Sequence, residues 1–332
     1  MKFYKEKTMQ QNENTALSGE LTIVSAFYDI GRGGILGAER DCEKYFEYFS
    51  FWAGLQNELV VFTSSEFAEK IRLVRANLGL ESKTKVIVKE LESFDEEALG
   101  KIREILANFD QSKGRKHPQN IECVSAEYDY VVYCKPFFVC EAINLGLTSE
   151  KVLWLDFGFN HGGSFFTNKN EFNFTLKAQD YAGFDESRIN LFALKDKEEA
   201  HLAEIYYSME VFLIAGIIYG AHEAWGKFRQ NLSEALRVFL SLQIIDDEQV
   251  LFVWCVRNYP QNYHIVKTPD WFESLSFFIP PQIRQNLSCK PPKAHKKHKK
   301  YKKQMKEHFK EKQYLKAFFS ASRYIFCKIK GK

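Results

Sequence analysis

The chain lacks the cysteine patterns of a disulfide framework or a zinc site. It has seven cysteines in 332 residues, an odd number, and no two of them stand in Cys-x-x-Cys spacing. Most lie within apolar or aromatic runs, where a free cysteine behaves as a small buried hydrophobic residue. We therefore expect reduced cysteines in the core of a cytoplasmic protein.

Long apolar segments are also absent. The longest apolar run, Val211–Tyr219, is too short to span a bilayer. Residues 1–20 are polar and contain no apolar signal-peptide core, so we expect a flexible leader there. Hydrophobic residues nevertheless make up 45% of the chain, which is enough for a large core. The sequence predicts a soluble or peripheral cytoplasmic protein.

The first glycine-rich loop, Asp29–Gly34, is neither a P-loop nor a dinucleotide-binding fingerprint. It directly follows an apolar run of strand length, and Gly31, Gly33 and Gly34 would let a ligand approach the backbone closely. The guanidinium of Arg32 suits phosphate oxygens. An ordinary turn would also explain these residues, but the position after the leading strand favours a ligand-binding loop.

The most informative segment is Val152–Phe159. An apolar run of strand length ends on one acid, Asp156, and a glycine-bearing loop, Gly158–Ser164, follows it. A carboxylate at the carboxyl end of a buried strand faces the crevice where open α/β sheets bind ligands. Turn initiation is the alternative role for such an acid. Because an unpaired charge is costly in a core, we favour a binding site.

Apolar runs of strand length alternate with stretches of helical period. The order β-α-β-α-β at the start of the chain indicates a parallel sheet, in one α/β domain of about 250 residues. Strands are expected at Leu21–Ala26, Glu58–Thr63, Thr84–Val88, Val152–Leu155, Ser208–Ile218 and Tyr263–Val266. Helices are expected at Asp41–Trp52, Ser65–Leu78, within Glu92–Arg115, from near Cys134 to Leu147, at Glu223–Leu242 and at Asp246–Val256.

Lys135 interrupts the apolar run Tyr130–Val139. A buried lysine needs a partner or loses its proton. The partner would be a diphosphate or Asp156, unless the side chain extends along its apolar stem to the surface.

His222 and Trp225 stand at the entrance of the expected helix Glu223–Leu242. The tryptophan would be able to stack on a sugar, although packing in the core is an equally good explanation.

Asp246 and Asp247 begin another expected helix. Carboxylates in a first helical turn are favoured by the helix dipole, so capping alone would account for them. Adjacent acids at an apolar-to-polar junction would also supply a general base. From the sequence alone, both the capping role and the general-base role stay open.

Together these motifs resemble the HtrL/YibB family, which includes WlaTB-like proteins encoded in lipooligosaccharide and lipopolysaccharide loci. Four segments carry the resemblance, within about residues 21–275: Thr22–Arg32, Glu58–Thr63, Glu127–Phe138 and Trp154–Gly158. Members are regarded as glycosyltransferases of the GT-A, nucleotide-diphospho-sugar type. The resemblance implies a GT-A-like α/β fold over residues 21–285, with a Rossmann-like, mixed, mainly parallel sheet flanked by helices.

In GT-A enzymes a strand ends in Asp-x-Asp, which holds a divalent cation against the diphosphate of the donor. The corresponding element here is Asp156-Phe-Gly158, with glycine in place of the second acid. The resemblance thus implies Mn²⁺ or Mg²⁺ on Asp156, with His161 or His264 as a second ligand.

Combining motifs and resemblance gives three expected sub-sites. The donor site would consist of Asp29, Arg32, Lys135, Asp156 and Gly158. The acceptor site would consist of His222 and Trp225, and the catalytic base would be Asp247 in preference to Asp246.

The carboxyl-terminal region is strongly basic. Residues 290–332 hold fifteen Lys, one Arg and two Glu, a net charge of +14, whereas the whole chain carries only +3. Apolar residues on one helical face follow the lysine run, a pattern typical of an interfacial membrane helix. We predict that residues 286–332 bind an anionic membrane surface. Nucleic-acid binding and an inert, solvated tail are the alternatives, and no nucleic-acid-binding module is recognisable.

The sequence therefore predicts a peripheral glycosyltransferase on the cytoplasmic face of the inner membrane. It would transfer a sugar from a nucleotide-sugar donor to a lipid-linked oligosaccharide of the lipooligosaccharide or lipopolysaccharide core. The alternative is a non-catalytic membrane accessory protein that binds a sugar or nucleotide on a degenerate transferase fold. The missing second acid at Gly158 supports that alternative.

Overall fold

The computed structural model describes residues 21–34, 40–196, 200–290, 320–322 and 325. The described residues up to Ser288 form one compact unit, and those from Cys289 onward belong to a second. The predicted leader, residues 1–20, and nearly all of the predicted membrane-binding tail, residues 286–332, lie outside the described residues. The fold and the candidate site are those of the first unit.

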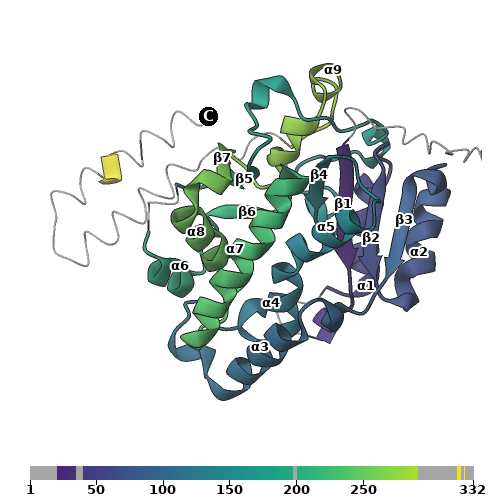
Figure 1. Ribbon diagram of the computed structural model, residues 1–332. Coiled ribbons are helices and arrows are strands. Elements are labelled where there is room, and N and C mark those ends of the chain that lie inside the picture. The colour runs from purple at the N-terminus through teal and green to yellow at the C-terminus, as the bar shows by residue number, and fades with distance from the viewer. Residues whose placement is uncertain (1–20, 35–39, 197–199, 291–319, 323–324, 326–332) are drawn as a thin grey trace, which may run out of the picture. The chain divides into compact units, whose positions relative to one another are not determined.

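The described residues form a seven-stranded sheet in the order β3-β2-β1-β4-β6-β5-β7 (Figure 1). β6 is antiparallel to both of its neighbours, and all other neighbouring strands are parallel. All strands except β6 therefore end at the same edge of the sheet. The strands are β1 Leu21–Phe27, β2 Leu59–Thr63, β3 Thr84–Val88, β4 Lys151–Leu155, β5 Ile189–Ala193, β6 Leu213–Ala221 and β7 Tyr263–Lys267.

Helices cover both faces of the sheet. One core cluster joins α3, α4, α5, α6, α7 and α8 to the sheet, and a second joins α1, α2 and the segments around Phe172 and Phe278 to its other face. Figure 1 shows α7 crossing in front of the sheet. The helices are α1 Cys42–Trp52, α2 Ser65–Ala76, α3 Glu96–Asn108, α4 Ala126–Tyr133, α5 Lys135–Asn144, α6 Leu202–Ser208, α7 His222–Ser241, α8 Glu248–Asn258 and α9 Pro281–Arg284.

The central strands β1 and β4 are almost entirely buried because both of their faces are covered. Val24 of β1 and Trp154 of β4 are register partners and belong to the first cluster. Their neighbours Ile23 and Leu153 point the opposite way and belong to the second. This alternation follows from the two-residue period of a strand. The expected α/β class, a mixed, mainly parallel sheet flanked by helices, is confirmed.

Most element predictions hold to within a few residues, and the exceptions have local causes. α5 begins at Lys135, as Pro136 predicts, because proline is tolerated in a first helical turn. The strand expected from Ser208 starts only at Leu213, since α6 runs to Ser208 and ends at Met209 with a φ of 57°. α4, α6 and β5 are not among the predicted elements. A five-residue apolar run such as β5 is too short for its periodicity to identify it.

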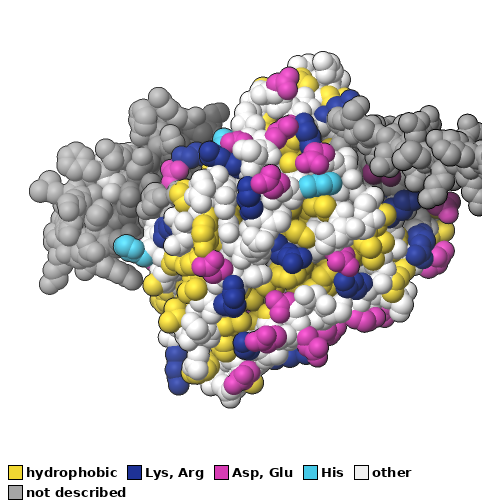
Figure 2. All heavy atoms as spheres, in the orientation of Figure 1, with side chains coloured by type: hydrophobic (Ala, Val, Ile, Leu, Met, Phe, Trp, Pro, Cys, Tyr) yellow, Lys and Arg dark blue, Asp and Glu magenta, His cyan; other side chains and the backbone are white. Residues whose placement is uncertain are grey.

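None of the described helices combines the length and apolarity needed to cross a membrane. On the face of the described residues that Figure 2 shows, basic and acidic side chains are interspersed. That face offers no continuous basic stripe of the kind that binds nucleic acid.

Candidate active site

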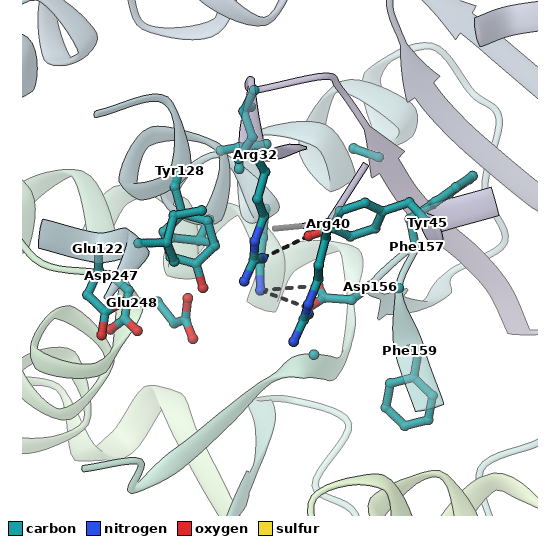
Figure 3. A pocket seen from close by; sticks show the side chains of 18 of the residues that line it. Arg32, Arg40, Tyr45, Glu122, Tyr128, Asp156, Phe157, Phe159, Asp247 and Glu248 are labelled. Atoms are coloured by element: carbon teal, nitrogen blue, oxygen red, sulfur yellow. Dashed lines mark hydrogen bonds and ion pairs between the residues drawn. The ribbon is translucent and has the colours of Figure 1, made fainter. Parts of the chain in front are cut away.

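A cavity of about 800 Å³ opens at the edge of the sheet where β1 and β4 end and β6 begins (Figure 3). This volume lies within the range of small-molecule sites. The walls come from the loop after β1, the start of α1, the start of α4 and the residues before it, the start of α5, the loop after β4, the start of α8 and residues 271–272. Among the residues predicted from sequence, those that line the cavity are Asp29, Arg32, Lys135, Asp156, Gly158, His161 and Asp247.

Asp156 and Lys135 form an ion pair at the base of the cavity. The Lys135 Nζ lies 3.1 Å from Asp156 Oδ1 and donates to Oδ2 at 3.4 Å and to the Ala215 carbonyl at 3.0 Å. Trp154 Nε1 also donates to Asp156 Oδ1, at 2.7 Å. Burial alone would lower the pKa of Lys135, but Asp156 and Glu248 raise it above its ordinary value. The ammonium, only 4% exposed, therefore stays charged.

The loop after Asp156 is held in a strained turn by one buried amide. Asn160 and His161 have positive φ values of 62° and 42°, which non-glycine residues rarely adopt. The Asn160 side chain accepts from the backbone N–H groups of Phe165 and Phe166 and donates to the Phe166 carbonyl. This network fixes the turn that brings Gly158 and His161 to the cavity wall.

Two arginines face the cavity: Arg40 lies on the side of Asp156, and Arg32 reaches in between Asp156 and Tyr128 (Figure 3). Arg32 donates to the Tyr45 hydroxyl at 2.8 Å, and its guanidinium lies 5.4 Å from the centre of the Tyr128 ring. Asp29 shapes the same loop, since its Oδ1 accepts from the Gly31 backbone N–H at 2.9 Å. This side of the cavity is suited to an anion.

Arg40 and His161 lie together on the same side. An Arg40 nitrogen is 3.3 Å from His161 Nε2, and the histidine ring packs against Tyr48 and Phe272. His161 remains open to solvent, yet its partial burial among these rings, together with Arg40, lowers its pKa to about 4. At neutral pH the ring is therefore neutral and able to accept a hydrogen bond from Arg40.

Carboxyl groups form the opposite side of the cavity. Figure 3 shows Glu122, Asp247 and Glu248 together, across the cavity from Arg40 and Asp156. Asp247 caps α8 by accepting from the Gln249 backbone N–H at 2.9 Å, so the predicted capping role is present as well. Burial, with Glu248 and Asp246 nearby, raises the pKa of Asp247 well above its usual range. Burial also raises the pKa of Glu248, against the opposing effect of Lys135.

A further acid, Asp129, lies behind this acidic side. It is 2% exposed, and neither of its carboxyl oxygens has a hydrogen-bond partner within the described part of the chain. Burial, followed by repulsion from Asp246 and Asp247, raises its pKa well above the ordinary value. Mutual repulsion and burial thus favour the protonated forms of Asp129, Asp247 and Glu248.

Asp246 is not a second candidate base, and that prediction is corrected. Its carboxylate pairs with Arg115, which also donates to the Ile245 carbonyl and lies against the Tyr206 ring. Burial raises the pKa of Asp246, and Arg115 opposes that rise. The side chain does not line the cavity, so its role in the described structure is to anchor the segment before α8.

The prediction for the acceptor site is also corrected. β6 runs antiparallel, so the helix that follows it begins at the opposite edge of the sheet from the cavity. His222 contacts the Thr148 hydroxyl and the Ser149 carbonyl at that edge. Trp225 is fully buried, and its Nε1 donates to the Gly220 carbonyl. Neither side chain reaches the cavity.

Of the two expected second metal ligands, His161 lies at the cavity with Asp156 and His264 does not. His264 is the second residue of β7, away from the carboxyl end of that strand, and does not line the cavity with Asp156. His161 lines the cavity, but its near neighbour is the cation Arg40. Within the described ranges, no group of three or more His, Cys, Asp or Glu side chains is arranged to hold a metal ion.

Several cavity residues escape the sequence analysis: Arg40, Tyr45, Glu122, Tyr128, Glu248, Trp271 and Phe272. Glu248 is adjacent to Asp247 and belongs to the same acidic run, which is a usable signal. The others come from loops and helices far apart in the sequence. Only the order of the strands brings them to one edge.

Two sequence comparisons agree with the resemblance to the HtrL/YibB family. Protein HtrL of Escherichia coli (strain K12) is 29% identical over 278 residues, which cover 79% of this chain and 93% of that protein. Among solved structures, the apo form of mouse xyloside xylosyltransferase 1 matches with a TM-score of 0.36 and 10% identity, over 74% of this chain and 85% of that chain. The family model described as "Bacterial protein of unknown function (HtrL_YibB)" matches residues 19–280. Because this match covers most of the sequence, the chain belongs to the HtrL/YibB family.

Proposed function

We propose that the protein is a glycosyltransferase that uses a nucleotide-sugar donor. The observation that carries the proposal is the division of one cavity into a cationic and an acidic side. Arg40 lies on one side, Asp247 and Glu248 lie opposite it, and Arg32 reaches between them. Transfer from an activated sugar needs positive charge for the departing diphosphate and a base for the attacking hydroxyl.

The cationic side would take the diphosphate of the donor. Guanidinium groups bind phosphate oxygens through paired, charge-assisted hydrogen bonds. The position also fits the general rule that open α/β sheets bind ligands beyond the carboxyl ends of their strands. The rings of Trp271 and Phe272, which line the same cavity, offer apolar surface for a base or a sugar.

The acidic side would take the acceptor. An acceptor oxygen would form a bond to the anomeric carbon of the donor sugar while the bond from that carbon to the diphosphate breaks. The hydroxyl proton would pass to the Asp247 carboxylate, and the electron pair of the broken bond would leave with the nucleoside diphosphate. Arg32 and Arg40 would stabilise the charge that develops on the leaving group.

For the acceptor we propose a lipid-linked oligosaccharide of the lipooligosaccharide or lipopolysaccharide core, or a related surface glycan. Support comes from the basic region of residues 290–332, whose net charge of +14 suits an anionic membrane. Each basic residue near such a surface contributes on the order of 1 kcal/mol. The protein would then work at the cytoplasmic face of the inner membrane, beside a lipid-linked substrate.

A non-catalytic accessory role is the second candidate. It is favoured by the strand-end motif, in which glycine occupies the place of a second acid. Such a protein would bind a sugar or nucleotide in the same cavity without turning it over. The two candidates differ in whether nucleoside diphosphate is released when both donor and acceptor are present.

The donor site is tested by thermal unfolding of the full chain with a panel of nucleotide sugars and nucleoside diphosphates. A ligand at about 100 times its Kd adds roughly 2.7 kcal/mol to the free energy of unfolding. We expect one nucleotide class to raise Tm by several degrees in the wild type and clearly less in Arg32→Met. If no nucleotide in the panel raises Tm, the donor site proposed here is wrong.

A further inference from the structure

A divalent cation is what the GT-A resemblance implies at the strand-end acid, and the residues around Asp156 do not fit one. Both carboxylate oxygens are already engaged by a protein cation. Lys135 Nζ lies 3.1 Å from Oδ1 and 3.4 Å from Oδ2, while Trp154 Nε1 donates to Oδ1. A hard divalent cation would have to share these oxygens with a buried ammonium, which also donates to the Ala215 carbonyl and would repel the metal.

A second acid two residues after Asp156 would also meet a steric barrier. A Cβ placed on Gly158 would lie 3.2 Å from Cε1 and 3.3 Å from Cδ1 of the Tyr45 ring. These distances are shorter than ordinary van der Waals contacts, so the ring would have to move. Tyr45 is held in place by the hydrogen bond from Arg32 to its hydroxyl. The ring therefore crowds any side chain at position 158, and its hydroxyl holds an arginine at the cavity.

The charges then balance without a metal ion. Lys135 neutralises Asp156, whose side chain is 36% exposed to the cavity and would otherwise repel a diphosphate. Arg40 adds positive charge on the same side, and Arg32 adds it in the middle of the cavity. The acids across the cavity, Asp247 and Glu248, have raised pKa values because they are buried, which makes their charged forms less populated.

We propose that this protein binds its nucleoside diphosphate without a divalent cation. Lys135 takes the charge-neutralising place of the metal at Asp156, and Arg32 and Arg40 contact the diphosphate. This inference rests on the proposed donor site and specifies how that site handles charge. Lys135 is a positioning and charge-balancing residue here, because the diphosphate contacts the arginines.

The test is calorimetric titration of the full chain with nucleoside diphosphates, once in excess EDTA and once in Mn²⁺. We expect the wild-type Kd to agree within about twofold between the two conditions. Lys135→Met leaves Asp156 uncompensated beside the ligand, so its Kd in EDTA should rise by at least about tenfold. The double variant Lys135→Met/Asp156→Asn removes both charges and should recover most of the affinity.

Lys151→Met is the matched control. Lys151 begins the strand that Asp156 follows, and it pairs with Glu186 at the edge of the sheet away from the cavity. The Kd of the Lys151→Met variant for nucleoside diphosphate should equal that of the wild type in both conditions. Thermal unfolding of each variant confirms that it is folded, and the double variant keeps the test valid should Lys135→Met be unstable.

Four results would overturn the inference. Wild-type binding that needs Mn²⁺ and disappears in EDTA refutes it while leaving the donor site intact. Unchanged affinity in Lys135→Met, or no recovery in a folded double variant, also refutes it. If no nucleoside diphosphate binds in either condition, the inference falls together with the proposed function.

Discussion

Asp247 and Asp246 are neighbours in sequence, yet the structure gives them different surroundings. Asp247 lines the cavity and caps α8, whereas Asp246 pairs with Arg115 outside the cavity lining. The sequence offers two acids in a plausible first helical turn and no means of knowing which of them faces a ligand. The choice depends on Arg115, a residue 131 positions away from Asp246.

Asp247→Asn should abolish most of the transfer activity. Asparagine keeps the capping hydrogen bond but cannot accept the acceptor proton, and general-base catalysis contributes typically 10²–10⁴-fold. We expect kcat to fall by at least about 100-fold, with Tm and the Kd for nucleoside diphosphate nearly unchanged. The measurement is nucleoside diphosphate release with donor and acceptor present.

The pH dependence provides the companion measurement for the same residue. Burial raises the pKa of Asp247, and only its deprotonated form acts as a base, so kcat/KM should rise with pH above the usual carboxyl range. The residual activity of Asp247→Asn should lack this rise. Wild-type-like turnover in the variant would remove Asp247 from the mechanism and favour the accessory role.

At the scale of elements, the sequence predicts where a strand ends but not which other elements lie beside that end. Asp156 after β4 and the loop Asp29–Gly34 after β1 are recognisable because an apolar run of strand length stops at a polar residue. His222 follows β6 in the same way, but β6 runs antiparallel, which sends it to the opposite edge. Local pattern carries no information on strand direction, and this is why the acceptor prediction fails.

One buried arginine joins several elements on the face of the sheet that the second core cluster covers. Arg75, near the end of α2, is 1% exposed and donates to the backbone carbonyls of Ala53, Leu55 and Asn57 and to the Thr84 hydroxyl. It thereby ties α2 to the turn before β2 and to the start of β3. Sequence alone gives no reason to place a guanidinium inside the fold.

Arg75→Met should lower the free energy of unfolding by about 3 kcal/mol or more, since buried carbonyls left without donors cost about 1–3 kcal/mol each. Arg72→Met is the control on the same helix. Arg72 pairs with Glu69 at the surface, and such pairs contribute about 0–1 kcal/mol. Urea unfolding measures both variants, and equal losses would show that the Arg75 network does not stabilise the fold.

At the scale of the whole molecule, the charge distribution and the family match concern different parts of the chain. The match covers residues 19–280, which include the sheet and the cavity. The basic run from Lys290 onward lies beyond it, and most of that run is outside the described residues. Membrane binding by this region therefore stays a prediction from composition and helical period.

Residues that line the cavity come from positions 26 to 272, and this spread limits what the sequence can reveal. Arg40, Tyr45 and Glu122 belong to no motif and acquire meaning only once β1 and β4 lie side by side. The α/β class, by contrast, follows from strand-length apolar runs alternating with helical period. The fold class can be predicted from local sequence patterns taken in order along the chain, whereas the composition of the site depends on long-range strand topology.

The most direct test of the account is photo-crosslinking of the full chain with azido derivatives of nucleoside diphosphates, with the labelled peptides identified by mass spectrometry. A donor site in this cavity should give adducts on peptides that contain Arg32, Tyr45 or His161, suppressed by an excess of the unmodified nucleotide. Labelling that the unmodified nucleotide does not suppress, or suppressible labelling confined to peptides outside the cavity, would contradict it.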